Sequence, residues 1–317
     1  MIKTTRKYIH LISRHSNWSE QGVKKALLEE VYNDEASWRK FLEVLFMTLG
    51  VSFMTAGVLF FFAYNWSDLH KFVKIGLVAG LLIVSTALIL FTNINENIKN
   101  IILTGASVLV GVLFAIYGQV YQTGANAYDL FFGWTLAIAL WVIVANFAAL
   151  WLVFILLINT TMLLYMEQIG MYSSPVSMAF LLFAINAGFL ITVLVGSKYA
   201  EAFKKPKWLT NLLAIGGISF STWGIILGVF SHPKIDFWVF LALAILLYSS
   251  GYIYGLKNKE GIYLTIIPFS VIVILSALLI KWSDGAGTFF IVSIFVVSSI
   301  TLVIRHLIHL QKQWNDE

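Results

Sequence analysis

Two short polar segments carry the residues best suited to binding a ligand. One is Asn65-Trp66-Ser67-Asp68, which ends an apolar run, and the other is GQVYQTGANAYDLFFGW at residues 118–134. Amides, carboxylates and phenols form hydrogen bonds, and indole rings supply flat apolar walls, as in ordinary ligand pockets. We therefore expect recognition rather than bond making from these residues. The expected site consists of Asn65, Trp66, Asp68, Gln119, Tyr121, Gln122, Asp129 and Trp134.

A simpler interpretation stays open for each polar segment taken alone. Trp anchors membrane helices at the interface, and Asn, Ser and Asp favour the turn that follows a helix. This interpretation accounts well for the segment at residues 65–68. It accounts less well for Gln119, which falls in the last turn of its apolar run, where a surface loop does not require an amide.

Several kinds of chemistry are disfavoured by the residue content. The chain has no cysteine, so it lacks a thiol nucleophile, a disulfide framework and a thiolate metal site. No His-Glu-x-x-His, phosphate-binding loop or Gly-x-Ser-x-Gly motif occurs. The apolar runs contain essentially no ionisable residue in their interiors, which argues against a carboxylate-driven proton pump and an intramembrane enzyme. We expect no cofactor and no bound metal, and the net charge of +5 does not indicate nucleic-acid binding.

Two amides stand out inside the apolar runs, Asn159 and Asn186. An amide in hydrocarbon must find a hydrogen-bond partner, because no water is present to solvate it. Two alternatives follow from this requirement. The two side chains bond to neighbouring helices, or they line a polar cavity near the middle of the membrane.

The apolar runs themselves set the architecture. Of the 317 residues, 59% are hydrophobic and only 12% are charged, about half the charged fraction of a soluble domain. A bilayer core is crossed by roughly 20 apolar residues in a helix. We therefore predict an all-α bundle of ten spans: Leu45–Tyr64, Phe72–Phe91, Ile101–Val120, Leu130–Ala145, Phe147–Met166, Val176–Val195, Leu209–Phe230, Phe237–Leu256, Ile262–Ile280 and Thr288–Ile304. The fourth and fifth spans have only Asn146 to separate them.

The distribution of basic residues predicts the orientation of the bundle. Cytoplasmic loops of membrane proteins are enriched in Lys and Arg. With ten spans and a cytoplasmic N-terminus, 17 of the 21 Lys and Arg residues fall on the cytoplasmic side and 4 on the other. Both termini are therefore expected in the cytoplasm, and both polar segments of the expected site face outward.

The residues before the first span form a separate segment. Residues 1–41 contain no apolar run of 7–15 residues, so they do not read as a signal peptide. Asn17 or Ser19 is placed to cap a helix over about residues 20–31, and Asn33 or Asp34 to cap the next. We expect a cytoplasmic helical segment at 1–41, a bundle at 42–307 with five spans to about 166 and five from about 176, and a cytoplasmic tail at 308–317.

The motifs of the first half resemble a known family. The runs LGVSFMTAGVLFFFAYNWSDLHK and GVLFAIYGQVYQTGANAYDLFFGW resemble the predicted bacterial membrane proteins catalogued as domain of unknown function 2157. The matching positions are Ala63, Asn65, Trp66, Gln119, Tyr121, Gly124 and Trp134, and the resemblance covers roughly residues 17–165. It implies a bacterial inner-membrane setting and a short helical segment before the first span, but it implies no reaction.

Two functions from different classes fit these features. The first is transport or flippase-like handling of a small or lipid-linked substrate, through an outward-facing polar pocket, with membrane lipid as the surroundings. The second is an envelope scaffold, sensor or assembly partner, in which the basic segment at residues 1–41 binds a cytoplasmic partner or anionic lipid. A polar cavity favours the first function, and a dry core with an exposed apolar patch favours the second.

Overall fold

The computed structural model describes residues 6–30, 35–169, 174–231, 235–283, 285 and 287–316 of the chain. The described part is mostly helical and contains no strand. Its α-helices are α1 (Arg6–Arg14), α2 (Glu20–Glu30), α3 (Glu35–Tyr64), α4 (Lys71–Phe91), α5 (Glu96–Tyr121), α6 (Ala127–Ala145), α7 (Ala148–Ile169), α8 (Pro175–Gly196), α9 (Lys207–Phe230), α10 (Ile235–Asn258), α11 (Gly261–Trp282) and α12 (Thr288–Asp316). A 3-10 turn, η1 (Glu201–Phe203), precedes α9.

The predicted bundle of about ten spans is confirmed. In the described residues, ten helices, α3 to α12, are long and apolar enough to cross a membrane. The fourth and fifth spans are two helices, as predicted, because α6 ends at Ala145 and α7 begins at Ala148. Most of these helices extend past the predicted apolar ends; α3, for example, begins at Glu35 rather than Leu45.

The chain divides into two compact units, Met1–Val120 and Tyr121–Glu317. In the first unit α1 and α2 pack against each other, and Ser19 caps α2 by accepting a hydrogen bond from the Gly22 amide at 3.1 Å. Asn33 and Asp34, the expected caps of the next helix, lie outside the described residues. That helix, α3, continues without a break from the N-terminal segment into the first span. The expected boundaries at residues 41 and 307 stay predictions.

The membrane helices of the first unit meet around one apolar cluster. It contains Phe62 of α3, Val78 of α4, and Leu109, Val112 and Ile116 of α5. Gly105 brings α3 and α5 into close contact, because a Cβ built there would lie 2.4 Å from the Val51 side chain. Glycine and other small residues let membrane helices approach in this way.

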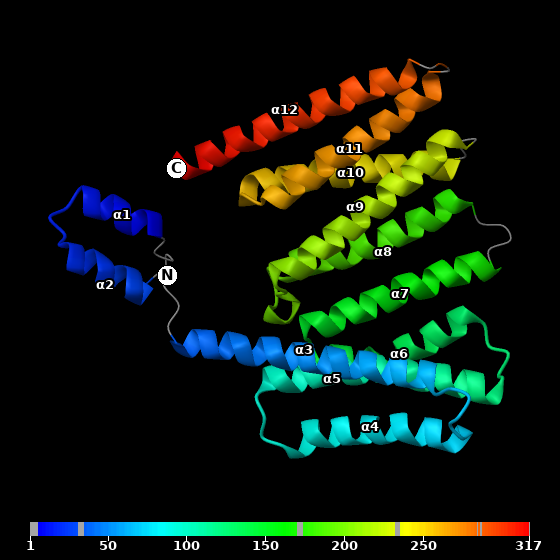
Figure 1. Ribbon diagram of the computed structural model, residues 1–317. Coiled ribbons are helices and arrows are strands. Elements are labelled where there is room, and N and C mark those ends of the chain that lie inside the picture. Colours follow the sequence, from blue (N-terminus) through cyan, green and yellow to red (C-terminus); the bar gives the residue numbers. More distant parts are fainter. Residues whose placement is uncertain are drawn as a thin grey trace. The chain divides into compact units, whose positions relative to one another are not determined.

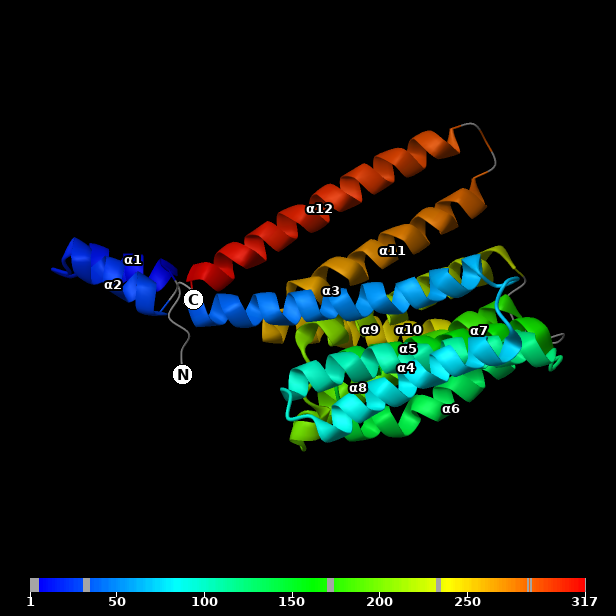
Figure 2. The same ribbon diagram turned by 60° about the horizontal axis from the view of Figure 1, so that its bottom comes forward.

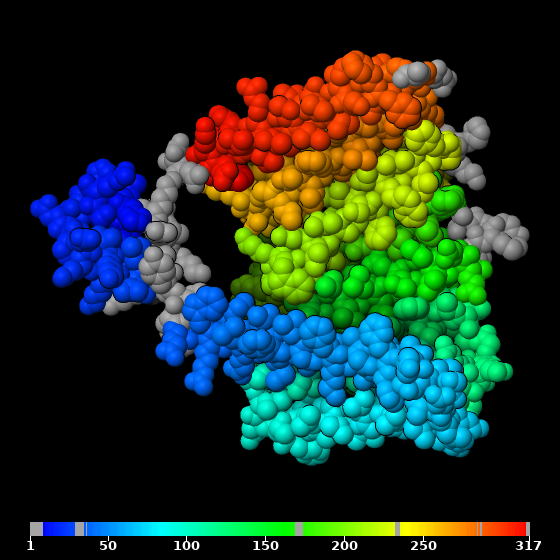
Figure 3. Space-filling view, in the orientation of Figure 1, coloured from blue at the N-terminus to red at the C-terminus, as the bar shows by residue number. Residues whose placement is uncertain are grey.

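The second unit contains α6 to α12, and its helices pack mostly against their neighbours in the chain. Figure 1 shows the pairs α6 with α7 and α8 with α9 side by side, and both pairs are in contact. Figure 2 shows α12 lying along α11, and α11 also contacts α9 and α10. In the space-filling view, α9 to α12 form one continuous packed surface from yellow-green to red (Figure 3). The fully buried Phe240 of α10 lies in the main apolar cluster of this unit.

The predicted orientation can be tested with single cysteines, because the chain has none of its own. We expect Ser67→Cys to react with a membrane-impermeant maleimide in intact cells, since its turn is predicted to face outward. Lys204→Cys should react only after the membrane is opened. The reverse pattern, with Lys204→Cys labelled in intact cells, would contradict the predicted orientation.

Candidate functional site

Two of the eight expected site residues line the same pocket in the first unit. Trp66, in the turn after α3, and Gln119, near the end of α5, border an open pocket of about 450 Å³. The rest of its wall is apolar and consists of Leu59, Phe62, Ala63, Val112, Ala115 and Ile116. The pocket therefore pairs an indole ring and an amide with hydrocarbon walls.

The indole of Trp66 is held in place by its surroundings. It packs against the apolar cluster of the first unit, and the Lys74 ammonium lies 3.9 Å from its ring centroid. Lys74 is only 8% exposed although it is a basic residue. A cation over an indole face is stabilised by the ring's quadrupole, so this contact orients both side chains.

Asn65 and Asp68 form local hydrogen bonds. The Asn65 side-chain amide donates to the Phe61 carbonyl at 2.9 Å, which satisfies a carbonyl at the C-terminal end of α3. The Ser67 hydroxyl donates to an Asp68 carboxylate oxygen at 3.1 Å. These contacts are those of a helix end and its turn, and they leave Trp66 as the residue of this segment that borders the pocket.

The remaining expected residues belong to the second unit. Tyr121 is the last residue of α5 and is exposed, and Gln122 follows it in the left-handed region with φ +45°. Asp129 completes a capping box at the start of α6, where its carboxylate accepts from the Asn126 amide at 2.9 Å. Trp134 stacks on Phe131 with ring centroids 5.9 Å apart. These contacts shape the start of α6.

The two intramembrane amides bond to each other. The Asn186 side chain of α8 donates to the Asn159 side-chain oxygen of α7 at 2.8 Å, and both residues are buried. Each amide also donates to the carbonyl four residues earlier in its own helix. The pair therefore links α7 to α8, which corresponds to the first alternative, in which the two side chains bond to neighbouring helices.

A buried cluster of four hydroxyls joins α9, α10 and α11. Tyr248 of α10 lies 2.6 Å from the hydroxyls of both Ser221 and Ser270, and Thr222 lies 2.6 Å from Ser270. Sequence reasoning missed this cluster, because single hydroxyls are common in membrane spans. The one available signal was a tyrosine in the middle of a span, which needs a buried partner for its hydroxyl.

Tyr248 also lines an apolar cavity of about 250 Å³. It lies between α8, α9, α10 and α11, and Ala187, Gly217 and Gly251 leave the space open by their small size. Ile191 and Val195 of α8, which line it, are 44% and 47% exposed, so the cavity opens along this face of the helix. Lys198, an exposed residue just after the end of α8, also lines the cavity.

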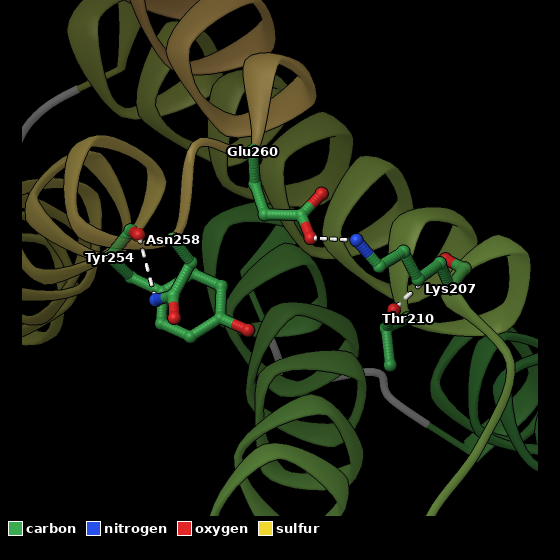
Figure 4. A network of polar contacts seen from close by, with 5 residues as sticks. All are labelled: Lys207, Thr210, Tyr254, Asn258 and Glu260. Carbon is green, nitrogen blue, oxygen red and sulfur yellow. Dashed lines mark hydrogen bonds and ion pairs between the residues drawn. The ribbon is translucent and has the colours of Figure 1, made fainter. Parts of the chain in front are cut away.

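A polar pocket of about 270 Å³ adjoins the apolar cavity. Leu194 and Tyr254 line both of them, so the two spaces share a wall. The polar residues that line the second pocket are Ser197, Lys204, Lys205, Lys207, Thr210, Asn211 and Glu260. Figure 4 shows Lys207 of α9 pointing toward Glu260, with which it forms an ion pair. Sequence reasoning used these lysines for orientation and did not assign them to a site.

Lys205 is held mainly by neutral groups. Its ammonium donates to the backbone and side-chain oxygens of Asn146 and lies 5.4 Å from the Trp151 ring centroid. Partial burial lowers the pKa of Lys205 from its ordinary value, because desolvation disfavours the charged form. Asn146 also donates to the Ala202 carbonyl at 2.9 Å and accepts from the Trp151 indole at 3.1 Å. It thus ties the α6–α7 turn to the loop before α9.

The comparisons with known proteins agree with the resemblance seen in the sequence. Residues 17–151 match the family model described as predicted membrane protein (DUF2157). No match was found among curated proteins or among solved structures. Over the described residues, no group of three or more His, Asp and Glu side chains is arranged to hold a metal ion. The matched family has a membrane setting and no assigned activity.

Proposed function

We propose that this membrane protein handles an amphipathic substrate, by transport or in the manner of a flippase. The observation that carries the proposal is the pair of adjoining spaces in the second unit, one apolar and one lined by three lysines. A molecule with a hydrocarbon part and a polar head fits such a pair, since each part finds a matching environment. Of the small and lipid-linked substrates expected from the sequence, the pair favours the lipid-linked class.

The cavity supports entry from the membrane rather than from water. Its walls are almost entirely hydrocarbon, and its exposed residues Ile191 and Val195 lie on a helix that crosses the bilayer. A lipid chain loses little on moving from the bilayer into such walls, because both environments are apolar. The polar head is then the part of the molecule that the protein can select.

The proposal includes the setting expected from the sequence. The protein lies in the bacterial inner membrane with both termini in the cytoplasm, so the lysine-lined pocket faces the cytoplasm. The Trp66–Gln119 pocket of the first unit then belongs to the outward end and is a second place where a substrate binds. Asn65, Asp68, Tyr121, Gln122, Asp129 and Trp134 stay proposed members of that outward region.

One observation favours the alternative role as an envelope scaffold or assembly partner. In α1 the apolar side chains of Leu11 and Ile12 are 54% and 47% exposed, and the helix carries basic residues including Arg14. A basic helix with an exposed apolar face binds anionic membrane surfaces. A protein with this role alone would not lose lipid binding when the cavity of the second unit is filled.

The cavity can be filled by one substitution. We expect Gly217→Leu to reduce co-purified or added lipid several-fold, because Gly217 lines the cavity and a Cβ there meets only ordinary contacts at 3.8 Å. Bound lipid would be counted by native mass spectrometry of the full chain in a neutral detergent. Gly188→Leu is the matched control, since a Cβ at Gly188 meets nothing within 4 Å. Unchanged lipid binding in a folded Gly217→Leu variant would contradict the proposal.

A further inference from the structure

We infer that the lysine-lined pocket binds the phosphate headgroup of an anionic lipid, one chain of which enters the adjoining apolar cavity. This inference rests on the proposed function and names the class of its substrate. It starts from the shared wall of the two spaces, at Leu194 and Tyr254. A headgroup in one space and a chain in the other are then parts of one molecule that passes these two side chains.

The charge of the site selects an anion. Of the lysines around the two spaces, Lys204 pairs with Glu201 at 2.6 Å and Lys207 pairs with Glu260. Within the described part of the chain, Lys198 and Lys205 have no acidic partner. The site therefore carries positive charge that its own carboxylates do not balance, and basic pockets between membrane helices bind anionic headgroups.

The donors around the pocket suit a phosphate in particular. Ammonium groups bind phosphate through charge-assisted hydrogen bonds, which are shorter and stronger than neutral ones. Asn211 and Ser197 add neutral polar groups to the same lining. In the Lys207–Glu260 pair the Lys207 side chain is 80% exposed and the Glu260 side chain 20% exposed, so the Lys207 ammonium stays open to an additional anion.

The hydrocarbon side gives the second half of the recognition. Leu213, Ile218, Leu247 and Tyr248 also line the cavity. The Tyr248 hydroxyl is already bonded within the buried cluster, so Tyr248 offers ring surface to the cavity rather than a free donor. We therefore expect a chain to enter and the charged head to stay at the rim.

The test compares three lipids that share the same chains. The full-length protein, delipidated in a neutral detergent, would be titrated with dioleoyl phosphatidic acid, dioleoyl phosphatidylcholine and dioleoylglycerol, and binding followed by native mass spectrometry. We expect phosphatidic acid to bind at least about tenfold more tightly than dioleoylglycerol. Lys198→Gln and Lys205→Gln should each weaken phosphatidic acid binding about tenfold and leave dioleoylglycerol binding unchanged.

Matched variants separate the site from general surface charge. Lys257→Gln removes the same charge from an exposed position of α10 that lines neither space, and it should bind phosphatidic acid like the unmodified chain. Lys205→Arg keeps the charge and should keep the binding. If Lys205→Gln lowers the folded yield through its contacts with Asn146, Lys198→Gln carries the test, because its side chain makes no such contact.

Results other than the expected ones overturn either the headgroup inference alone or the proposed function as well. Equal binding of all three lipids overturns the headgroup inference and leaves the proposed function standing. Binding of none of them overturns the proposed function and the inference with it. Displacement of phosphatidic acid by inorganic phosphate at similar concentrations would assign the pocket to a free anion, and an equal loss in Lys257→Gln would assign the effect to surface charge. Either result overturns the inference that the pocket binds a lipid headgroup.

Discussion

Replacing Gly224 by Leu should destabilise the second unit by about 2–3 kcal/mol or more, the upper range for overpacking a buried site. Gly224 is buried on α9 where that helix meets α8 and α10. A Cβ built there lies 2.6 Å from the Ala179 Cβ and 2.5 Å from the Phe240 ring. Neither neighbour can yield cheaply, because the Ala179 Cβ is fixed to its backbone and Phe240 is fully buried. The helices must therefore separate.

The measurement is thermal unfolding of the purified protein in detergent, followed by size-exclusion chromatography of the heated samples. Gly188→Leu adds the same side chain to another membrane helix of this unit, at a position that meets nothing within 4 Å. We expect a clear fall in the midpoint for Gly224→Leu and little change for Gly188→Leu. Equal midpoints for the two variants would show that α8, α9 and α10 do not pack as closely as the structure indicates.

Much of the fold follows from the sequence, because one physical requirement dominates it. A span must satisfy its backbone groups internally and present hydrocarbon outward, so length and apolarity alone locate a membrane helix. All ten predicted spans correspond to helices. Small residues let membrane helices approach closely, and Gly105 of α5 does pack closely on Val51.

The cavity could not be predicted in this way, because it depends on which helix faces meet. Tyr248 is 27 residues from Ser221 and 22 from Ser270, and nothing in a uniformly apolar span marks the face that carries each hydroxyl. The asparagines are an intermediate case. Burial forced Asn159 and Asn186 to find partners, and only the packing of α7 on α8 makes each the partner of the other.

The candidate site shows the same limit at shorter range. The sequence predicts a site that includes Trp66 and Gln119, and both of these residues line one pocket. The sequence does not reveal that the Asn65 side chain donates to the Phe61 carbonyl. An asparagine that ends a helix and an asparagine that binds a ligand look the same in a sequence. The lysines near α9 are a further example. The number of these lysines predicts on which side of the membrane their loop lies. That they line one pocket together depends on the fold.

Asn146 is the position where a weak sequence signal has the largest structural consequence. It alone separated two uncharged spans, and in the structure it has φ +48° and ψ +29°, the left-handed conformation that ends α6. Asn tolerates this conformation better than other residues with a Cβ, because its short polar side chain bonds locally. Here that side chain also reaches Ala202 and Lys205, 56 and 59 residues away.

We therefore expect Asn146→Ala to cost about 2 kcal/mol, from lost hydrogen bonds of ~0.5–1.5 kcal/mol each and the strain of a left-handed alanine. Asn146→Gly removes the same side chain but adopts the left-handed backbone freely, so it should cost about 1 kcal/mol less. Thermal unfolding of both variants in detergent measures the two contributions separately. The difference in stability between the two variants measures the cost of placing alanine in the left-handed conformation.

A second measurement follows the loop that Asn146 holds. A cysteine introduced by Ala202→Cys should react with a maleimide faster in the Asn146→Ala and Asn146→Gly backgrounds alike, because both lose the side chain that ties this loop to the α6–α7 turn. The two variants should thus differ in stability but agree in loop reactivity. If reactivity at position 202 instead followed stability, the loop would be opening by unfolding of the unit, and Asn146 would act only as the residue that ends α6.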